Sequence, residues 1–137
     1  ALKNVLESIR KTTDRKIILV FGCGGDRDKT KRPMMGEVAA RLVDYTIITS
    51  DNPRAENPQT IIDEIVKGFS GDPFKVVVSR KDAIEQALEL AQNIRGNAVV
   101  LIAGKGHETY QIFSDRTINF NERQIVKEYI LNHEFKS

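Results

Sequence analysis

The chain has 137 residues, 40% of them hydrophobic, which suits one domain with a full core and no disulfide or metal staples. Its 21 basic and 19 acidic residues are interspersed and give a net charge of +2, so no basic stripe of the kind that nucleic-acid binding requires is present. One cysteine, no secretory signal and no apolar run of about 18 residues predict a cytoplasmic protein, which we expect to be a monomer without a membrane partner.

Apolar periodicity predicts helices that alternate with strands along the chain. The predicted elements are, in order, a helix over 2–9, a strand over 16–21, a helix after Pro33 that includes Met34, Val38 and Leu42, a strand over 45–49, a helix over 58–69, a strand over 74–78, a helix over 80–94, a strand over 98–103, a hairpin of strands over 110–113 and 117–120, and a final helix that starts at Asn121. The pair Met34 and Met35 is expected in the core.

Polar residues predict where several helices begin. Asn57 followed by Pro58 is typical of an N-cap with proline at the first helical position. Ser79 with Asp82 three residues later resembles a capping box. These signals support the chain order of elements given above.

Helices that alternate with strands predict an α/β, Rossmann-like fold with a mostly parallel sheet, helices on both faces and a C-terminal β-hairpin at one edge. In such sheets, ligands bind beyond the carboxyl ends of the strands. The loops at 22–28, 50–54 and 104–108 all follow strands at that end. Together they supply a mixed-sign set that suits a zwitterion: Arg27, Asp51, Asn52, Arg54, Lys105, His107 and Glu108.

The tetrad Asp51-Asn52-Pro53-Arg54 is the most informative of these loops. Pro53 restricts its own φ angle and keeps Asn52 out of helical geometry, so the two acceptors and the guanidinium are held on a stiff backbone. Taken alone, the tetrad favours an ordinary turn over a binding loop, because Asp, Asn and Pro are common turn residues.

Nucleotide and metal sites are not predicted from the motifs. The glycine loop fails the dinucleotide fingerprint, because Arg27 stands where the last glycine should be. The chain has no P-loop sequence, so any ATP pocket must lie mainly elsewhere. His107 has only His133 as a second histidine, and a hydrogen bond within the loop is a simpler role for it than metal binding.

No catalytic residue is predicted. Cys23 follows a strand and could be a nucleophile, but no partner is implied by the sequence, and a small buried hydrophobic side chain is the commoner outcome. The segment 29–32, Lys-Thr-Lys-Arg, is predicted to be a solvated charged turn, with phosphate binding as the alternative.

Three stretches taken together resemble the C-terminal domain of a Mur ligase. They are Val20-Phe21-Gly22-Cys23-Gly24-Gly25-Asp26-Arg27-Asp28 with Lys31-Arg32-Pro33, then Asp51-Asn52-Pro53-Arg54, then Gly104-Lys105-Gly106-His107-Glu108. The likeness runs over almost the whole chain and is strongest to the branch that adds meso-diaminopimelate to UDP-N-acetylmuramoyl-L-alanyl-D-glutamate. It implies that residues 1–137 are one amino-acid-binding domain, that N-terminal and central ATP-binding domains are absent from this chain, and that the chain alone is catalytically incomplete.

The resemblance also implies roles for single residues. In this family the residues that match the following positions contact the incoming amino acid: Arg27, Asp51, Asn52, Pro53, Arg54, Gly104 and Glu108. Arg54 would bind the distal carboxylate through its planar fork, which lysine lacks. Asp51, Asn52 and Glu108 would accept hydrogen bonds from ammonium groups, and Gly104 would let the backbone approach the ligand.

The implied activity is that of an ATP-dependent ligase of peptidoglycan biosynthesis, which serves cell wall biogenesis, cell shape and cell division. ATP and Mg²⁺ would be bound mainly by the absent central domain. Two alternatives stay open: a lysine-adding ligase or a folylpolyglutamate synthetase of the same superfamily, and a non-enzymatic α/β module that binds an amino acid or a nucleotide. Arg54 discriminates among the ligases, because a substrate without a distal carboxylate has no use for it.

Overall fold

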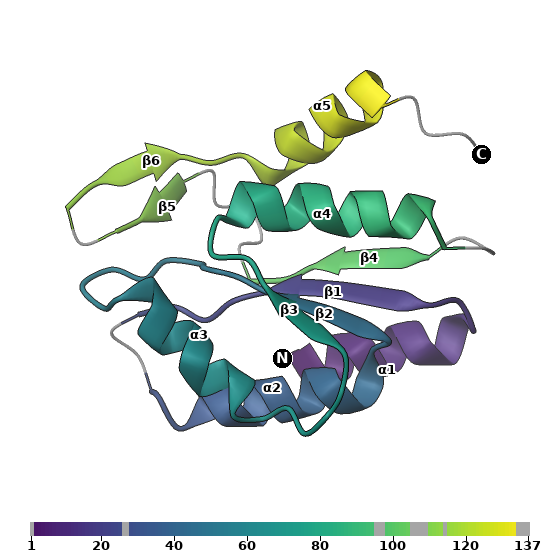
Figure 1. Ribbon diagram of the computed structural model, residues 1–137, viewed down its shortest axis with the longest axis horizontal. Helices are drawn as coiled ribbons and strands as arrows, with labels where there is room; N and C mark the ends of the chain where they lie inside the picture. The colour runs from purple at the N-terminus through teal and green to yellow at the C-terminus, as the bar shows by residue number, and fades with distance from the viewer. Residues whose placement is uncertain (1, 26–27, 95–97, 105–109, 114, 134–137) are drawn as a thin grey trace.

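The computed structural model describes residues 2–25, 28–94, 98–104, 110–113 and 115–133 (Figure 1). Each predicted helix and strand is present. The elements are, in chain order, α1 (Leu2–Thr12), β1 (Ile17–Phe21), α2 (Lys31–Leu42), β2 (Tyr45–Ile48), α3 (Pro58–Val66), β3 (Phe74–Val76), α4 (Arg80–Gln92), β4 (Val99–Ile102), β5 (Tyr110–Ile112), β6 (Thr117–Asn119) and α5 (Glu122–His133).

Strands β1 to β4 form a four-stranded sheet in the order β3-β2-β1-β4, and every pairing in it is parallel. Strand β1 lies inside the sheet and all its residues are buried, as its continuous apolar sequence predicts. In the register, Leu19 of β1 lies between Thr46 of β2 and Leu101 of β4. The predicted parallel, Rossmann-like α/β fold is therefore confirmed.

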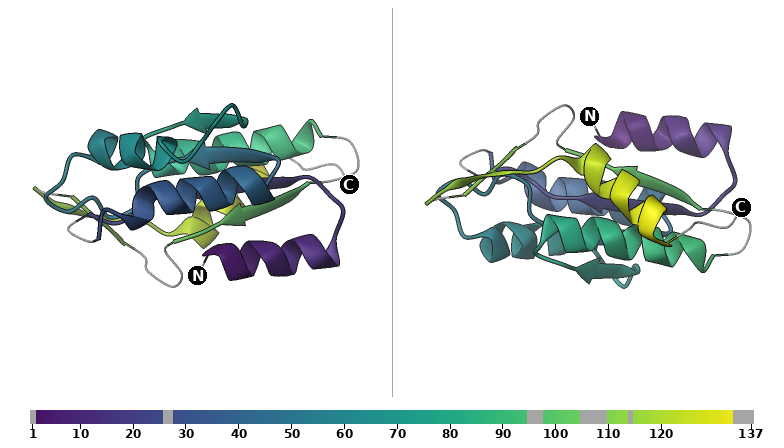
Figure 2. Two further views of the ribbon diagram at one scale, coloured as in Figure 1. Left: turned by 90° about the horizontal axis from the view of Figure 1, so that it is seen from below. Right: turned by 90° about the horizontal axis from the view of Figure 1, so that it is seen from above.

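Alternate side chains of β1 contribute to two separate cores. Leu19 and Phe21 pack with α1, α2 and α3 on one face of the sheet, whereas Ile18 and Val20 pack with α4 and α5 on the other. Figure 1 shows these layers edge-on, and Figure 2 shows the two helical faces from below and from above. Within the part of the chain that the structure describes, no helix is both long and apolar enough to cross a membrane.

The strand order reverses beside β1. The chain moves outward from β1 to β2 and β3 through α2 and α3 on one face, and α4 then returns across the other face to place β4 on the opposite side of β1. The helices that follow β1 and β4 along the chain, α2 and α5, therefore lie on opposite faces of the sheet. Ligand sites of open parallel sheets lie at such a switch point, beyond the carboxyl ends of the strands.

The predicted N-caps are confirmed. The side chain of Asn57 accepts a hydrogen bond from the Gln59 N–H at 2.9 Å, with Pro58 in the first turn of α3. The hydroxyl of Ser79 accepts one from the Asp82 N–H at 3.4 Å at the start of α4. Each cap satisfies an N–H group that the helix itself leaves without a partner, so these helices begin where the sequence predicts.

The structure corrects two predictions. The hairpin does not extend the main sheet: β5 and β6 pair with each other in a separate two-stranded sheet, which lies toward the carboxyl ends of the parallel strands (Figure 1). Met34 is not in the core: it is 63% exposed, because the face of α2 that packs against the sheet carries Met35, Val38, Ala39 and Leu42 instead. Met35 does pack against the core, as predicted.

Asp44 connects the amino ends of β1 and β2. Its Oδ2 accepts hydrogen bonds from the Ile17 N–H at 2.8 Å and from Arg10 Nη2 at 3.0 Å. Burial opposes its ionisation, but the Ile17 N–H, Arg10 and Lys16 outweigh burial and lower the pKa of the Asp44 carboxyl below its usual 3.8. The ionised form therefore stabilises the folded state.

We predict that Asp44→Asn lowers the free energy of unfolding at pH 7 by about 0.5–1 kcal/mol, a small value because about a third of the side chain is exposed. Because the folded-state pKa is lowered, this stabilisation is complete above the usual pKa and is lost as pH falls through the lower folded value. Urea unfolding between pH 3 and pH 7 measures it. Asp14→Asn, at an exposed position, is the control. A pH-independent difference for Asp44→Asn would contradict the prediction.

Candidate functional site

The loops that follow β1, β2 and β4 meet at the switch point, as the sequence predicts for their described parts. The Gly25 N–H donates to the Asn52 carbonyl oxygen at 2.7 Å. A β-carbon on Gly25 would lie 1.7 Å from the Pro53 oxygen, so only glycine allows this approach. A β-carbon on Gly104 would lie 3.7 Å from Asp51 Oδ2, which places the third loop beside the tetrad.

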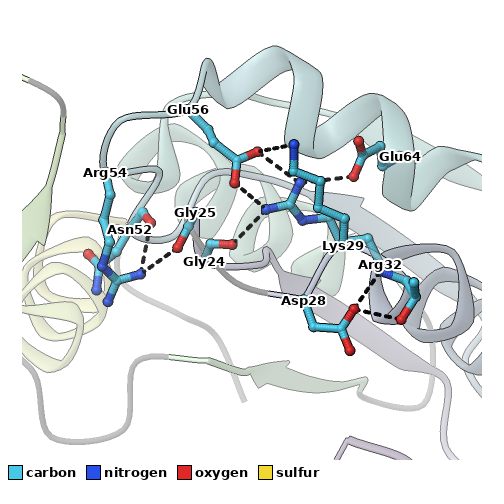
Figure 3. A network of polar contacts seen from close by, with 10 residues as sticks. Gly24, Gly25, Asp28, Lys29, Arg32, Asn52, Arg54, Glu56 and Glu64 are labelled. Atoms are coloured by element: carbon cyan, nitrogen blue, oxygen red, sulfur yellow. Dashed lines mark hydrogen bonds and ion pairs between the residues drawn. The ribbon is translucent and has the colours of Figure 1, made fainter.

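Arg54 occupies a strained backbone position at the centre of this site. Its φ angle is 54°, in the left-handed region that a residue with a side chain enters at a cost of about 1–2 kcal/mol. Its Nη1 donates to the carbonyl oxygens of Gly25 at 3.2 Å and of Asn52 at 3.3 Å. In Figure 3 the other nitrogens of the guanidinium point away from the glycine loop. The Arg54 side chain therefore ties the tetrad to the glycine loop.

The other described members of the site differ in exposure. Asn52 is only 3% exposed, and its carbonyl accepts hydrogen bonds from both Gly25 and Arg54, so it supports the loop. Asp51 is partly exposed. Gly104 has a φ angle of 114°, which other residues rarely adopt, and it leaves the backbone open beside Asp51.

Four predicted site residues lie outside the described residues. They are Arg27, Lys105, His107 and Glu108. The predicted convergence of loops therefore concerns residues 22–25, 50–54 and 104.

Arg32 corrects the prediction of a solvated charged turn. Lys29 and Lys31 are exposed, as expected, but Arg32 is only 1% exposed. Its guanidinium pairs with Glu56 at 2.9 Å and Glu64 at 2.9 Å and donates to the Gly24 carbonyl oxygen at 3.0 Å (Figure 3). Arg32 therefore holds the glycine loop against the segment that enters α3, and it is not positioned in the open to bind phosphate.

A second buried arginine that the sequence analysis missed supports the site from the other face. Arg80 is the first residue of α4 and is 1% exposed. Its guanidinium contacts the carbonyl oxygens of Ser50 and Ala103, the residues that directly precede Asp51 and Gly104. Its position at a helix start gave no local signal of this role.

Cys23 lies in a cavity of about 520 Å³ beside the glycine loop. Its Sγ is 3.6 Å from Met35 Sδ. Burial raises the pKa of the Cys23 thiol to about 11, with smaller contributions from Arg32, which lowers it, and from Asp51 and Glu64, which raise it. The thiol is therefore protonated at neutral pH, and its surroundings do not favour the nucleophile alternative.

Comparison with known proteins gives consistent results. Residues 1–106 match the family model described as Mur ligase, glutamate ligase domain. The chain is 52% identical over 129 residues to UDP-N-acetylmuramoyl-L-alanyl-D-glutamate--2,6-diaminopimelate ligase 1 of Clostridium acetobutylicum, covering 94% of this chain and 26% of that protein. It is 53% identical over 125 residues to the Clostridium perfringens ligase of the same name, covering 91% of this chain and 25% of that protein.

A solved structure of a UDP-N-acetylmuramoyl-L-alanyl-D-glutamate--2,6-diaminopimelate ligase superposes with a TM-score of 0.86 at 34% identity. The match covers 98% of this chain and 28% of that one. The chain thus spans about a quarter of the length of the curated relatives that it matches.

We predict that Arg32→Gln lowers the free energy of unfolding by about 3–5 kcal/mol, because it leaves Glu56 and Glu64 without their buried cation. Lys29→Gln is the matched control: Lys29 lies 3.9 Å from the same Glu56 but its side chain is 62% exposed, so its loss should cost less than about 0.5 kcal/mol. Urea unfolding of each variant measures both values. Equal effects of the two substitutions would show that the buried cluster contributes no more than a surface pair.

We predict that iodoacetamide alkylates Cys23 on the order of 100-fold more slowly in the folded chain than in the unfolded chain at pH 8, because a raised pKa leaves little thiolate. The rate should rise as pH approaches 11. Mass spectrometry of the alkylated chain measures this rate, and no second cysteine contributes. Equal rates in the folded and unfolded chain would restore the reactive-thiol alternative.

Proposed function

We propose a function from the family to which the chain belongs, the Mur ligases, whose glutamate ligase domain it matches. The chain would bind meso-diaminopimelate and position it for ligation to UDP-N-acetylmuramoyl-L-alanyl-D-glutamate. The names of the Clostridium relatives support this choice of substrates. This chain corresponds to about a quarter of such a ligase, and the rest of the ligase would hold the UDP-linked substrate and ATP with Mg²⁺. No P-loop sequence occurs in these 137 residues, so they do not fit a cradle for the ATP phosphates.

The observation that carries this proposal is the placement of both a guanidinium, that of Arg54, and a carboxylate, that of Asp51, at the switch point of the sheet. Both belong to one short loop, and Gly104 closes the same site from β4. A diamino dicarboxylate has ammonium and carboxylate groups at both ends, so it needs acceptors and a cation together. Arg54 would bind the distal carboxylate, since a guanidinium fork matches a carboxylate in geometry as well as charge.

The remaining roles follow from the same chemistry. Asp51 would accept from an ammonium group, with Glu108 as a further acceptor and Arg27 as a second cation, whereas Asn52, which is only 3% exposed, would act through the loop that it supports. Pro53 would keep the tetrad rigid, and Gly104 would allow the ligand to approach the backbone. These residues would bind and orient the amino acid and would not transfer protons, so we assign no catalytic residue to this domain.

The reaction would be amide formation. ATP would supply the phosphoryl group that turns the D-glutamyl carboxylate into an acyl phosphate, with ADP as the leaving group. The uncharged amino group of the bound amino acid would then attack the acyl carbon and form the C–N bond. Phosphate would leave with the C–O bond electrons, and the nitrogen would lose a proton to solvent. The domain's contribution is to hold the amine in the attack geometry. Orientation of this kind is worth up to about 7–11 kcal/mol in well-aligned systems.

We predict that Arg54→Ala in the complete ligase lowers kcat/KM for diaminopimelate by roughly 30-fold to several thousand-fold, equivalent to about 2–5 kcal/mol for breaking a desolvated charge pair. Arg54→Lys should be nearly as damaging, because an ammonium group lacks the planar fork. Activity with lysine, which has no distal carboxylate, should fall far less. The measurement is the ratio of kcat/KM for diaminopimelate to that for lysine in each protein.

This ratio of kcat/KM values distinguishes two roles of Arg54: recognition of the distal carboxylate and support of the loop. Arg54 also hydrogen-bonds Gly25 and Asn52, and a damaged loop would affect both amino acids equally. Arg116→Ala, at an exposed arginine that pairs with its neighbour Asp115, is the control and should leave the ratio unchanged. An unchanged ratio in Arg54→Ala would refute recognition of the distal carboxylate. Preference of the wild type for lysine would favour the lysine-adding alternative, and amino-acid binding without ligase activity in the complete protein would favour the binding module.

A further inference from the structure

Arg80, the first residue of α4, makes side-chain hydrogen bonds to three residues that lie outside its own helix. Its Nη1 donates to the Ser50 oxygen at 3.2 Å, its Nη2 donates to the Ala103 oxygen at 2.9 Å, and its Nε pairs with Glu122 Oε2 at 2.9 Å. The three guanidinium nitrogens thus reach three separate segments of the chain. Its side chain is fully buried, whereas Glu122 is 14% exposed.

Burying an arginine is costly unless hydrogen bonds and a counter-charge replace its water. Here two main-chain oxygens and one carboxylate do so. An apolar side chain of similar size often gives equal or greater stability at a buried ion pair, so stability alone is a weak reason for this arrangement. What an apolar side chain could not do is fix the distance between two carbonyl groups.

Those carbonyl groups belong to the residues that lead into the site. Ser50 directly precedes Asp51, and Ala103 directly precedes Gly104. They follow β2 and β4, the two strands that flank β1, so one planar guanidinium spans the end of the central strand. A β-carbon on Gly104 would lie 3.9 Å from Arg80 Nη2, which shows how near the guanidinium is to the site.

We propose that Arg80 is a positioning residue for the amino-acid site, which sets the separation between the 50–54 loop and Gly104. This inference rests on the proposed function. Arg80 does not face the ligand; its effect passes through the main chain of Ser50 and Ala103. A change in their separation would move Asp51 relative to Gly104 and so weaken the hold on the amino acid.

The C-terminal part of the chain takes part through two residues beyond the family match at 1–106. Glu122, at the start of α5, orients Arg80 through its Nε. Gln111 of β5 is 3% exposed, and its Nε2 donates to Ser50 Oγ at 3.3 Å and to the Asp51 carbonyl oxygen. The hairpin therefore contacts Ser50 and Asp51 directly, and α5 acts on Ser50 and Ala103 through Arg80.

We predict that Arg80→Gln, Arg80→Lys and Glu122→Gln in the complete ligase each raise KM for diaminopimelate, by roughly 10- to 100-fold for the Arg80 variants, the size expected of a misplacement of about 1 Å. KM for ATP and for the UDP-linked substrate should stay close to wild type, because other parts of the ligase would hold them. Arg80→Lys keeps a cation near Glu122, so its melting temperature should recover relative to Arg80→Gln while KM for diaminopimelate stays high. A purely structural role predicts that both recover together.

Arg10→Gln is the matched control. Arg10 also joins two main-chain carbonyl oxygens, those of Arg15 and Leu42, to the carboxylate of Asp44, but at the opposite end of the sheet. It should lower the melting temperature without changing KM for diaminopimelate. If Arg10→Gln and Arg80→Gln raise that KM equally, the effect is general loosening and the proposal is overturned.

The remaining outcomes are also decisive. If Arg80→Gln fails to fold, Glu122→Gln decides, and an unchanged KM for diaminopimelate in that variant overturns the proposal. Absence of diaminopimelate-dependent phosphate release in the wild-type ligase would refute the proposed function itself. An active wild type with unaffected variants would refute only the role of Arg80.

Discussion

The rest of the structure depends on the central position of β1. This strand lies between two parallel neighbours and is covered by helices on both faces of the sheet. Because the strands are parallel, the carboxyl ends of β2, β1 and β4 lie at the same end of the sheet. The reversal of strand order there places α2 and α5, the helices that follow β1 and β4, on opposite faces, and open parallel sheets bind ligands at such a point. The site is therefore a consequence of topology before any side chain is chosen.

Topology alone does not fix the positions of the three loops relative to one another. Two buried arginines hold them in place. Arg32 ties the glycine loop to Glu56 and Glu64 on one face, and Arg80 ties the ends of β2 and β4 to Glu122 on the other. Both use guanidinium groups to satisfy main-chain carbonyls at the ends of secondary structure. Short loops have few apolar contacts of their own, so such charged clamps are an effective way to order them.

The sequence predicted the elements well where the signal is local. The apolar run of β1 and the caps at Asn57 and Ser79 each depend on neighbours within a few residues, and each is where the pattern indicates. Prediction failed where the decisive contact is distant. Met34 follows the helical period but faces outward, and Arg32 sits in a run of exposed charges, yet its partners are 24 and 32 residues away.

The sequence by itself determined the α/β order of elements, the parallel sheet and the loops that carry the tetrad and the glycines, because periodicity, capping and turn chemistry are local properties. Only the tertiary structure decided that the hairpin forms its own sheet, that Arg54 takes a left-handed backbone over Gly25, and that Arg80 spans Ser50 and Ala103. The physical reason is that a buried charge must find whichever oxygens the fold brings to it, and those oxygens belong to segments that the local sequence does not identify.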